Sequence, residues 1–164
     1  MFQKNANKIL LVVATGYSIL LSISVVILYL IDLLTNFSEY SLGNFVFVII
    51  LLIVYTFMLI SNVSIILNKQ RNLFFVFSIF IYALQVLKFS IQGFTFDLIF
   101  GTEIYPYLDF TSRFKYGLAI NWWDLEYTVY YLSSYHYFTI GVNLIAILLI
   151  ITYFRLLRFR PTLK

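Results

Sequence analysis

The chain has 164 residues, of which 62% are hydrophobic and only 11% are charged, and its formal net charge at pH 7 is +4. Soluble domains typically contain about 25% charged residues, so this composition and the mean hydropathy of +0.94 exclude an ordinary water-soluble globule and predict an integral membrane protein. Because the chain contains no cysteine, disulfides, thiol redox chemistry and cysteine-ligated metals are excluded as well.

Four apolar stretches are long enough to cross a bilayer as helices, which takes roughly 20 apolar residues. In chain order they are 9–31, 45–67, 73–91 and 137–157. Runs such as FVFVIILLIVYTFMLI do not alternate between polar and apolar residues, which favours helices over membrane-spanning strands. The sequence therefore predicts one transmembrane domain over residues 1–164, an all-α, up-down bundle of four transmembrane helices.

Several residues in these stretches are suited to helix packing. Ala14, Ser18 and Ser22 recur every four positions in the first stretch, a spacing that lets helix backbones approach closely. Asn62 and Asn143 carry amides that can form hydrogen bonds between helices. We interpret all five as assembly residues.

The third stretch carries a polar stripe, because polar residues recur at steps of three or four and would share one helical face. These residues are Ser78, Tyr82, Gln85, Lys88 and Gln92. Lys88 lies near the outer end, where it can extend to the membrane surface or form an ion pair with Asp97 or another outer carboxylate. The alternative is a transport, proton or ligand role for Gln85, Lys88 and Gln92, since ionisable groups inside a membrane are functional candidates.

Residues 92–136 form the one long connection, which we expect to be an ordered outer cap because long structureless loops are uncommon in small proteins. The stretch NWWDLEYTVYYLSSYHYF, 121–138, is rich in aromatic residues, as are membrane interfaces and subunit contacts. Asn121 with Asp124 three residues later predicts the start of a helix that continues into the fourth span. A ligand site is the other interpretation of this cap, and its candidate residues are Asp97, Trp122, Trp123, Asp124, Glu126 and His136.

Charges separate by side along this topology. The basic residues Lys4, Lys8, Lys69, Arg71, Arg155, Arg158, Arg160 and Lys164 fall on the side of both termini, whereas all seven acidic residues fall on the other side or at its edge. The positive-inside rule then places both termini in the cytoplasm or the mitochondrial matrix, in a bacterial or mitochondrial inner membrane. The basic side could attract anionic lipids, and the charge does not indicate nucleic-acid binding.

We expect a non-catalytic small subunit or accessory protein of a larger respiratory or transport complex, with other membrane subunits as partners and a homo-oligomer as an alternative. A transporter or channel component with a polar path around Lys88 is the second hypothesis. The third is a membrane-edge enzyme that uses the outer carboxylates and His136, the single histidine. We assign no catalytic residue, no metal ligand and no cofactor.

Overall fold

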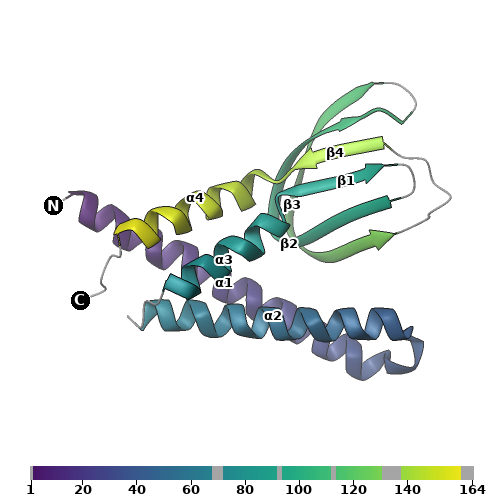
Figure 1. Ribbon diagram of the computed structural model, residues 1–164, viewed down its shortest axis with the longest axis horizontal. Coiled ribbons are helices and arrows are strands. Elements are labelled where there is room, and N and C mark those ends of the chain that lie inside the picture. The colour runs from purple at the N-terminus through teal and green to yellow at the C-terminus, as the bar shows by residue number, and fades with distance from the viewer. Residues whose placement is uncertain (1, 68–71, 92–93, 112–113, 131–137, 160–164) are drawn as a thin grey trace. The chain divides into compact units, whose positions relative to one another are not determined.

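A computed structural model describes residues 2–67, 72–91, 94–111, 114–130 and 138–159. The chain forms two compact units, one made of Met1–Ser78 with Thr152–Lys164 and the other of Ile79–Ile151. The described residues form four α-helices, one short 3-10 helix and four β-strands (Figure 1). We refer to the two parts as the helical unit and the sheet unit.

The helical unit is built on two long helices, α1 (Phe2–Thr35) and α2 (Leu42–Ile66), with the 3-10 helix η1 (Phe37–Glu39) between them. The hydroxyl of Ser41 caps α2 by accepting a hydrogen bond from the Asn44 amide. Within the described residues, only Asn5–Thr35 and Leu42–Ile66 are long and apolar enough to cross a membrane, by length and composition alone. Helix α1 contains the first predicted stretch, and α2 contains the second except for residue 67.

The other two helices are much shorter than predicted. Helix α3 (Asn72–Leu84) has 13 residues and α4 (Leu144–Phe159) has 16. At 1.5 Å per residue they measure about 20 and 24 Å, less than the roughly 30 Å of a hydrocarbon layer. The predicted all-α, multi-pass four-helix bundle is therefore wrong, because the predicted spans 73–91 and 137–157 each combine a short helix with a β-strand.

The sheet unit contains an antiparallel sheet in the order β1-β4-β2-β3. Its strands are β1 (Leu87–Ile91), β2 (Phe94–Asp109), β3 (Lys115–Tyr130) and β4 (Phe138–Val142). Strand β1 pairs with β4 and also with the start of β2, while the end of β2 pairs with β4. The long β2–β3 hairpin therefore curls around the β1–β4 pair, and Figure 1 shows it on both sides of that pair.

An irregularity in the middle of the hairpin accompanies this curl. The pairing register shifts between Gly101 and Glu103, so that Gly101 pairs with Asp124 but Glu103 pairs with Asn121. Gly101 has a φ of 96°, a conformation that suits glycine because it has no β-carbon. Such bulges bend and twist strands, which allows one hairpin to reach both edges of the short strand pair.

Two further predictions about this region were wrong. Asn121 does not begin a helix but lies within β3, and α4 begins only at Leu144. The polar stripe of the third stretch is not a helical face, because α3 ends at Leu84 and Lys88 lies in β1. In the described part of the predicted outer cap, residues 94–109 and 115–130 are strands.

Candidate functional site

The curled sheet brings together a buried group of charged and polar side chains, which we call the Lys88 cluster. It consists of Lys88 from β1, Asp97, Glu103 and Tyr105 from β2, and Asn121 from β3. Lys88 Nζ donates to both carboxylate oxygens of Glu103, at 2.8 and 2.9 Å. It also lies 3.2 Å from Asp97 Oδ2 and 4.0 Å from the centre of the Tyr105 ring.

Glu103 is the most enclosed member of the cluster, with 1% of its surface exposed. Asn121 Nδ2 donates to its Oε1 at 2.6 Å, so both carboxylate oxygens have partners. Charged groups are this deeply buried almost only when they are paired and hydrogen-bonded. The bonds from Lys88 and Asn121 meet that requirement, and they tie three strands together at one point.

Asp97 differs from Glu103, because its charge is only partly compensated. Its Oδ1 atom is buried and has no hydrogen-bond partner among the described residues. Burial raises the pKa of the Asp97 carboxyl group above its usual value of 3.8, although the nearby Lys88 ammonium acts in the opposite direction. Burial likewise raises the pKa of the Tyr105 hydroxyl. The cluster thus contains two carboxyl groups for one ammonium.

A cavity of about 200 Å³ lies beside the cluster on the same face of the sheet. The side chains on this face combine charged, hydroxyl and aromatic groups, namely Lys88, Ser90, Thr95, Asp97, Tyr105, Tyr107 and Thr139. Phe89, Phe96, Ile140 and Gly141 also line the cavity, but strand alternation directs the side chains of Phe89, Phe96 and Ile140 to the other face. The Ser90 and Thr95 hydroxyls lie 2.8 Å apart and share a hydrogen bond. The cavity can therefore offer both polar and apolar contacts to a small molecule.

Two glycines make room for the tyrosine rings on this face. A β-carbon added at Gly141 would lie 2.8 Å from Cδ2 of Tyr105, and one added at Gly117 would lie 2.7 Å from Cζ of Tyr107. Each ring therefore lies directly against the backbone of a neighbouring strand. Gly141 in particular permits the position of Tyr105 over the Lys88 ammonium.

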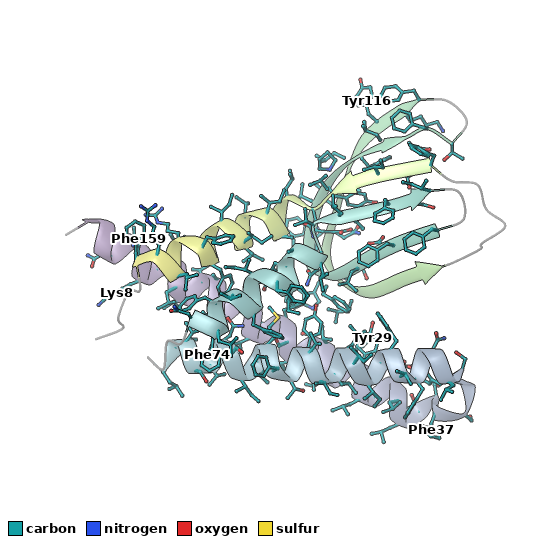
Figure 2. All side chains as sticks on the ribbon, viewed as in Figure 1. Lys8, Tyr29, Phe37, Phe74, Tyr116 and Phe159 are labelled. Carbon is teal, nitrogen blue, oxygen red and sulfur yellow. The ribbon has the colours of Figure 1, made fainter. Side chains whose placement is uncertain are left out.

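The opposite face of the hairpin is apolar and exposed. We call it the apolar patch, and it consists of Leu108 from β2 and Tyr116, Leu118, Ile120 and Trp122 from β3. These β3 residues alternate along the strand, as expected for side chains on one face. Tyr116 and Trp122 are each 80% exposed, and the side chain of Tyr116 points away from the strands in Figure 2. The sheet thus has its charges inside and large apolar side chains outside.

The predicted cap residues have several different locations. Asp97 belongs to the Lys88 cluster, and Trp122 and Trp123 are exposed at the register shift. Asp124 lies next to this shift and accepts a hydrogen bond from the backbone of Leu125. Glu126 pairs with Ile99 through the backbone of β3, but its side chain is outside the described part of the structure. His136 lies outside the described residues altogether.

The predicted polar stripe is divided by the end of α3. Gln85 is buried in the turn that follows the helix, whereas Lys88 lies in the strand. Gln92 is outside the described residues. The partners of Lys88 in the structure are Asp97, which the sequence suggested, and Glu103, which it did not single out.

The predicted packing residues meet in the helical unit around Tyr153 of α4, which sequence reasoning missed. Ser18 Oγ of α1 lies 2.7 Å from the Tyr153 hydroxyl, and the side-chain oxygen Oδ1 of Asn62 in α2 accepts a hydrogen bond from that hydroxyl at 2.5 Å. Asn62 also donates to Ser78 of α3 at 3.4 Å. One hydroxyl network therefore contacts all four helices within this unit.

The remaining packing residues have simpler roles. Ala14 and Ser22 are buried in α1, and the Ser22 hydroxyl donates to the Ser18 carbonyl one turn earlier. Asn143 acts as the N-cap of α4, because its side-chain oxygen accepts hydrogen bonds from the amides of Ile145 and Ala146. It therefore stabilises the start of its own helix.

The described residues contain no group of three or more His, Cys, Asp or Glu side chains that could hold a metal ion. Comparisons of the chain with family models, with curated proteins and with solved structures gave no match.

Proposed function

We propose that the protein is a membrane-anchored, non-catalytic accessory subunit that docks onto a partner protein in a larger membrane complex. In this proposal α1 and α2 form the anchor, and the apolar patch of the sheet unit is the docking surface. The observation that carries the proposal is the exposure of a row of large apolar side chains on a folded strand, including Tyr116 and Trp122.

The composition of the apolar patch supports a protein partner. Leu108 pairs with Tyr116, Pro106 with Leu118 and Ile104 with Ile120, so apolar residues adjoin across the two strands. Contiguous exposed patches of this kind mark interaction sites in folded proteins, and tyrosine and tryptophan are enriched in the centres of interfaces. Exposed aromatic residues also occur at membrane surfaces. A measurement in lipid vesicles therefore distinguishes a lipid contact from a protein contact.

The alternative functions have less support. The transport hypothesis needed Gln85, Lys88 and Gln92 on one helical face, and Lys88 lies on a strand instead. The enzyme hypothesis relied on outer carboxylates, and Glu103 already has both oxygens bonded to Lys88 and Asn121. A carboxylate held in this way supports the fold more readily than it transfers protons.

Native mass measurement after extraction from the membrane in a mild detergent tests the proposal. We expect the wild-type chain to migrate with a constant set of other proteins. Leu118→Asp places a charge in the centre of the apolar patch and should release the partner while the sheet remains folded. Lys115→Glu changes the charge of the same hairpin outside the patch, and this control should keep the partner.

Three outcomes would contradict the proposal. A wild-type chain that migrates alone, or only with copies of itself, has no partner of the expected kind. A Leu118→Asp chain that keeps its partner places the docking surface elsewhere. Transfer of Trp122 into lipid in vesicles that contain only the purified chain, seen as a blue shift in emission, assigns the patch to the membrane surface.

A further inference from the structure

The cavity beside the Lys88 cluster has the properties of a binding site, which the docking proposal does not use. Its volume of about 200 Å³ corresponds to roughly seven water molecules at their liquid volume. That space accommodates a small organic molecule rather than a peptide or a nucleotide. The chemistry of its lining then decides which class of small molecule it suits.

The charges at the cavity favour a cation. Lys88 is surrounded by acceptors, with two contacts to Glu103 and one to Asp97. An anionic ligand would therefore compete with two carboxylates for one ammonium and would be repelled by both. A cationic ligand would instead supply the positive charge that the cluster lacks. Asp97 is the group to receive it, because it lines the cavity and its side chain is 27% exposed, whereas Glu103 is enclosed.

The remaining walls favour a ligand with an apolar body. The rings of Tyr105 and Tyr107 line the cavity with their centres 5.8 Å apart, and the Thr139 side chain lines it from β4. Aromatic rings attract cations through their π faces and also pack against hydrocarbon. A ligand with an ammonium group at one end and an apolar body at the other end matches both kinds of wall.

We propose that this cavity binds a small primary amine in its protonated form, with the ammonium group at Asp97 and the apolar body against the rings of Tyr105 and Tyr107. The site does not depend on the docking function, because the cavity and the apolar patch use opposite faces of the hairpin. A free amine and the ethanolamine headgroup of a lipid share this chemistry.

Titration of the purified full chain in detergent with benzylamine, benzyl alcohol and benzoate, followed by ligand-observed NMR, tests the proposal. The three probes have similar shapes and differ in charge. We expect benzylamine to bind at least tenfold more tightly than the other two, because a hydrogen bond to a charged partner is generally worth about a tenfold change in affinity or more. Equal binding of the three probes, preferred binding of benzoate, or no binding of benzylamine overturns the proposal.

Variants separate the cavity from partition into detergent. Asp97→Asn should weaken benzylamine binding about tenfold or more, whereas Asp109→Asn, on the same strand but outside the cavity lining, should leave it unchanged. Thr139→Leu fills the cavity without removing a charge, and it should also abolish binding. Since Thr139→Leu keeps the ion pairs, it keeps the test decisive even if Asp97→Asn fails to fold. Unchanged affinity in Thr139→Leu overturns the proposal.

Repeating the benzylamine titration in nanodiscs identifies the natural source of the amine. Competition by lipids with an ethanolamine headgroup, and not by choline lipids, assigns the site to a headgroup. Binding that is independent of the lipid headgroup assigns it to a free amine. Both results uphold the proposed site, and both are distinguishable from a failure of the docking function, because none of these titrations involves a partner protein.

Discussion

Replacing Lys88 with methionine tests how far the buried ion pair supports the sheet unit. Methionine is close to lysine in length but has no charge, so Lys88→Met removes the ammonium that contacts Glu103 at 2.8 and 2.9 Å. Glu103 is 1% exposed and cannot reach water without opening the sheet. The variant therefore leaves a buried carboxylate whose remaining hydrogen bond comes from Asn121.

The expected loss of stability follows from two limits. At an effective dielectric constant of about 20, unit charges about 2.8 Å apart attract each other by about 6 kcal/mol, but the desolvation of both groups offsets part of this attraction. The second limit is empirical, because removing one partner of a buried ion pair typically costs about 3–5 kcal/mol. We therefore expect Lys88→Met to lower the free energy of unfolding by about 3–5 kcal/mol at pH 7.

Intrinsic fluorescence provides a specific assay for this effect. The chain contains two tryptophans, and both Trp122 and Trp123 lie in β3. Denaturant titration in detergent, followed by tryptophan emission, therefore reports on the sheet unit.

The double variant Lys88→Met/Glu103→Gln is the matched control. It removes both charges of the Lys88–Glu103 pair while the glutamine oxygen can still accept from Asn121, so part of the stability should return. The loss of the Lys88 contact with Asp97 remains in both variants. A loss below about 1 kcal/mol for Lys88→Met, the value for an exposed ion pair, would refute the reasoning. A double variant no more stable than Lys88→Met would refute it as well.

Three further predictions concern other contacts. Asp97→Asn should remove a pH dependence of the melting temperature. Burial raises the pKa of Asp97 above 3.8 in the folded state, so the wild-type melting temperature should rise as the pH falls from this raised pKa toward 3.8. The variant should not show this rise. Gly141→Ala should lower the free energy of unfolding of the sheet by about 1–3 kcal/mol, because the added carbon displaces Tyr105 from Lys88. Tyr153→Phe should lower the stability of the helical unit in SDS titration by about 0.6–2 kcal/mol, because it removes one interhelical hydroxyl.

Each of these predictions has a control with a matched chemical change. Asp109→Asn should keep the pH dependence above 3.8, because a hydrogen bond lowers the pKa of that exposed carboxyl group and moves its effect below 3.8. Gly43→Ala should be neutral or slightly stabilising, since a β-carbon there meets nothing within 4 Å. Tyr116→Phe changes the same hydroxyl at an exposed site and should have little effect. If a control variant shows the same change in stability or pH dependence as its test variant, the corresponding prediction is wrong.

The two long helices could be predicted from sequence because length and hydropathy determine them. The stretch 9–31 lies within α1, and 45–67 lies within α2 except for its last residue. No competing element of that length tolerates so many apolar residues. Ser18 and Asn62 could be selected as packing residues for a related reason, since polar groups on apolar helices must find partners inside the protein. Tyr153 could not, because tyrosine is also common where helices enter a membrane.

The sheet could not be predicted from hydropathy because its two short strands continue the apolar runs of helices. LKFSI and FTIGV are each apolar enough to extend a helix, and short apolar runs do not distinguish strands from helices. Their pairing also joins residues about 50 positions apart, which no local pattern encodes. The hairpin did carry a signal: Tyr116, Leu118, Ile120 and Trp122 alternate with smaller residues, a period of two that the aromatic content concealed.

The size of the apolar patch limits the affinity that it can contribute to the proposed docking. Burying Tyr116, Leu118, Ile120 and Trp122 would contribute about 1.5–3 kcal/mol each, or about 6–12 kcal/mol in total. The loss of translational and rotational freedom on association costs an estimated 4–15 kcal/mol, so the apolar patch alone provides little net affinity. A stable complex therefore requires a second contact, and the exposed apolar side chains of α1 and α2 are suited to provide it against partner helices. Confinement to one membrane would favour this arrangement further, because anchored partners lose less freedom when they associate.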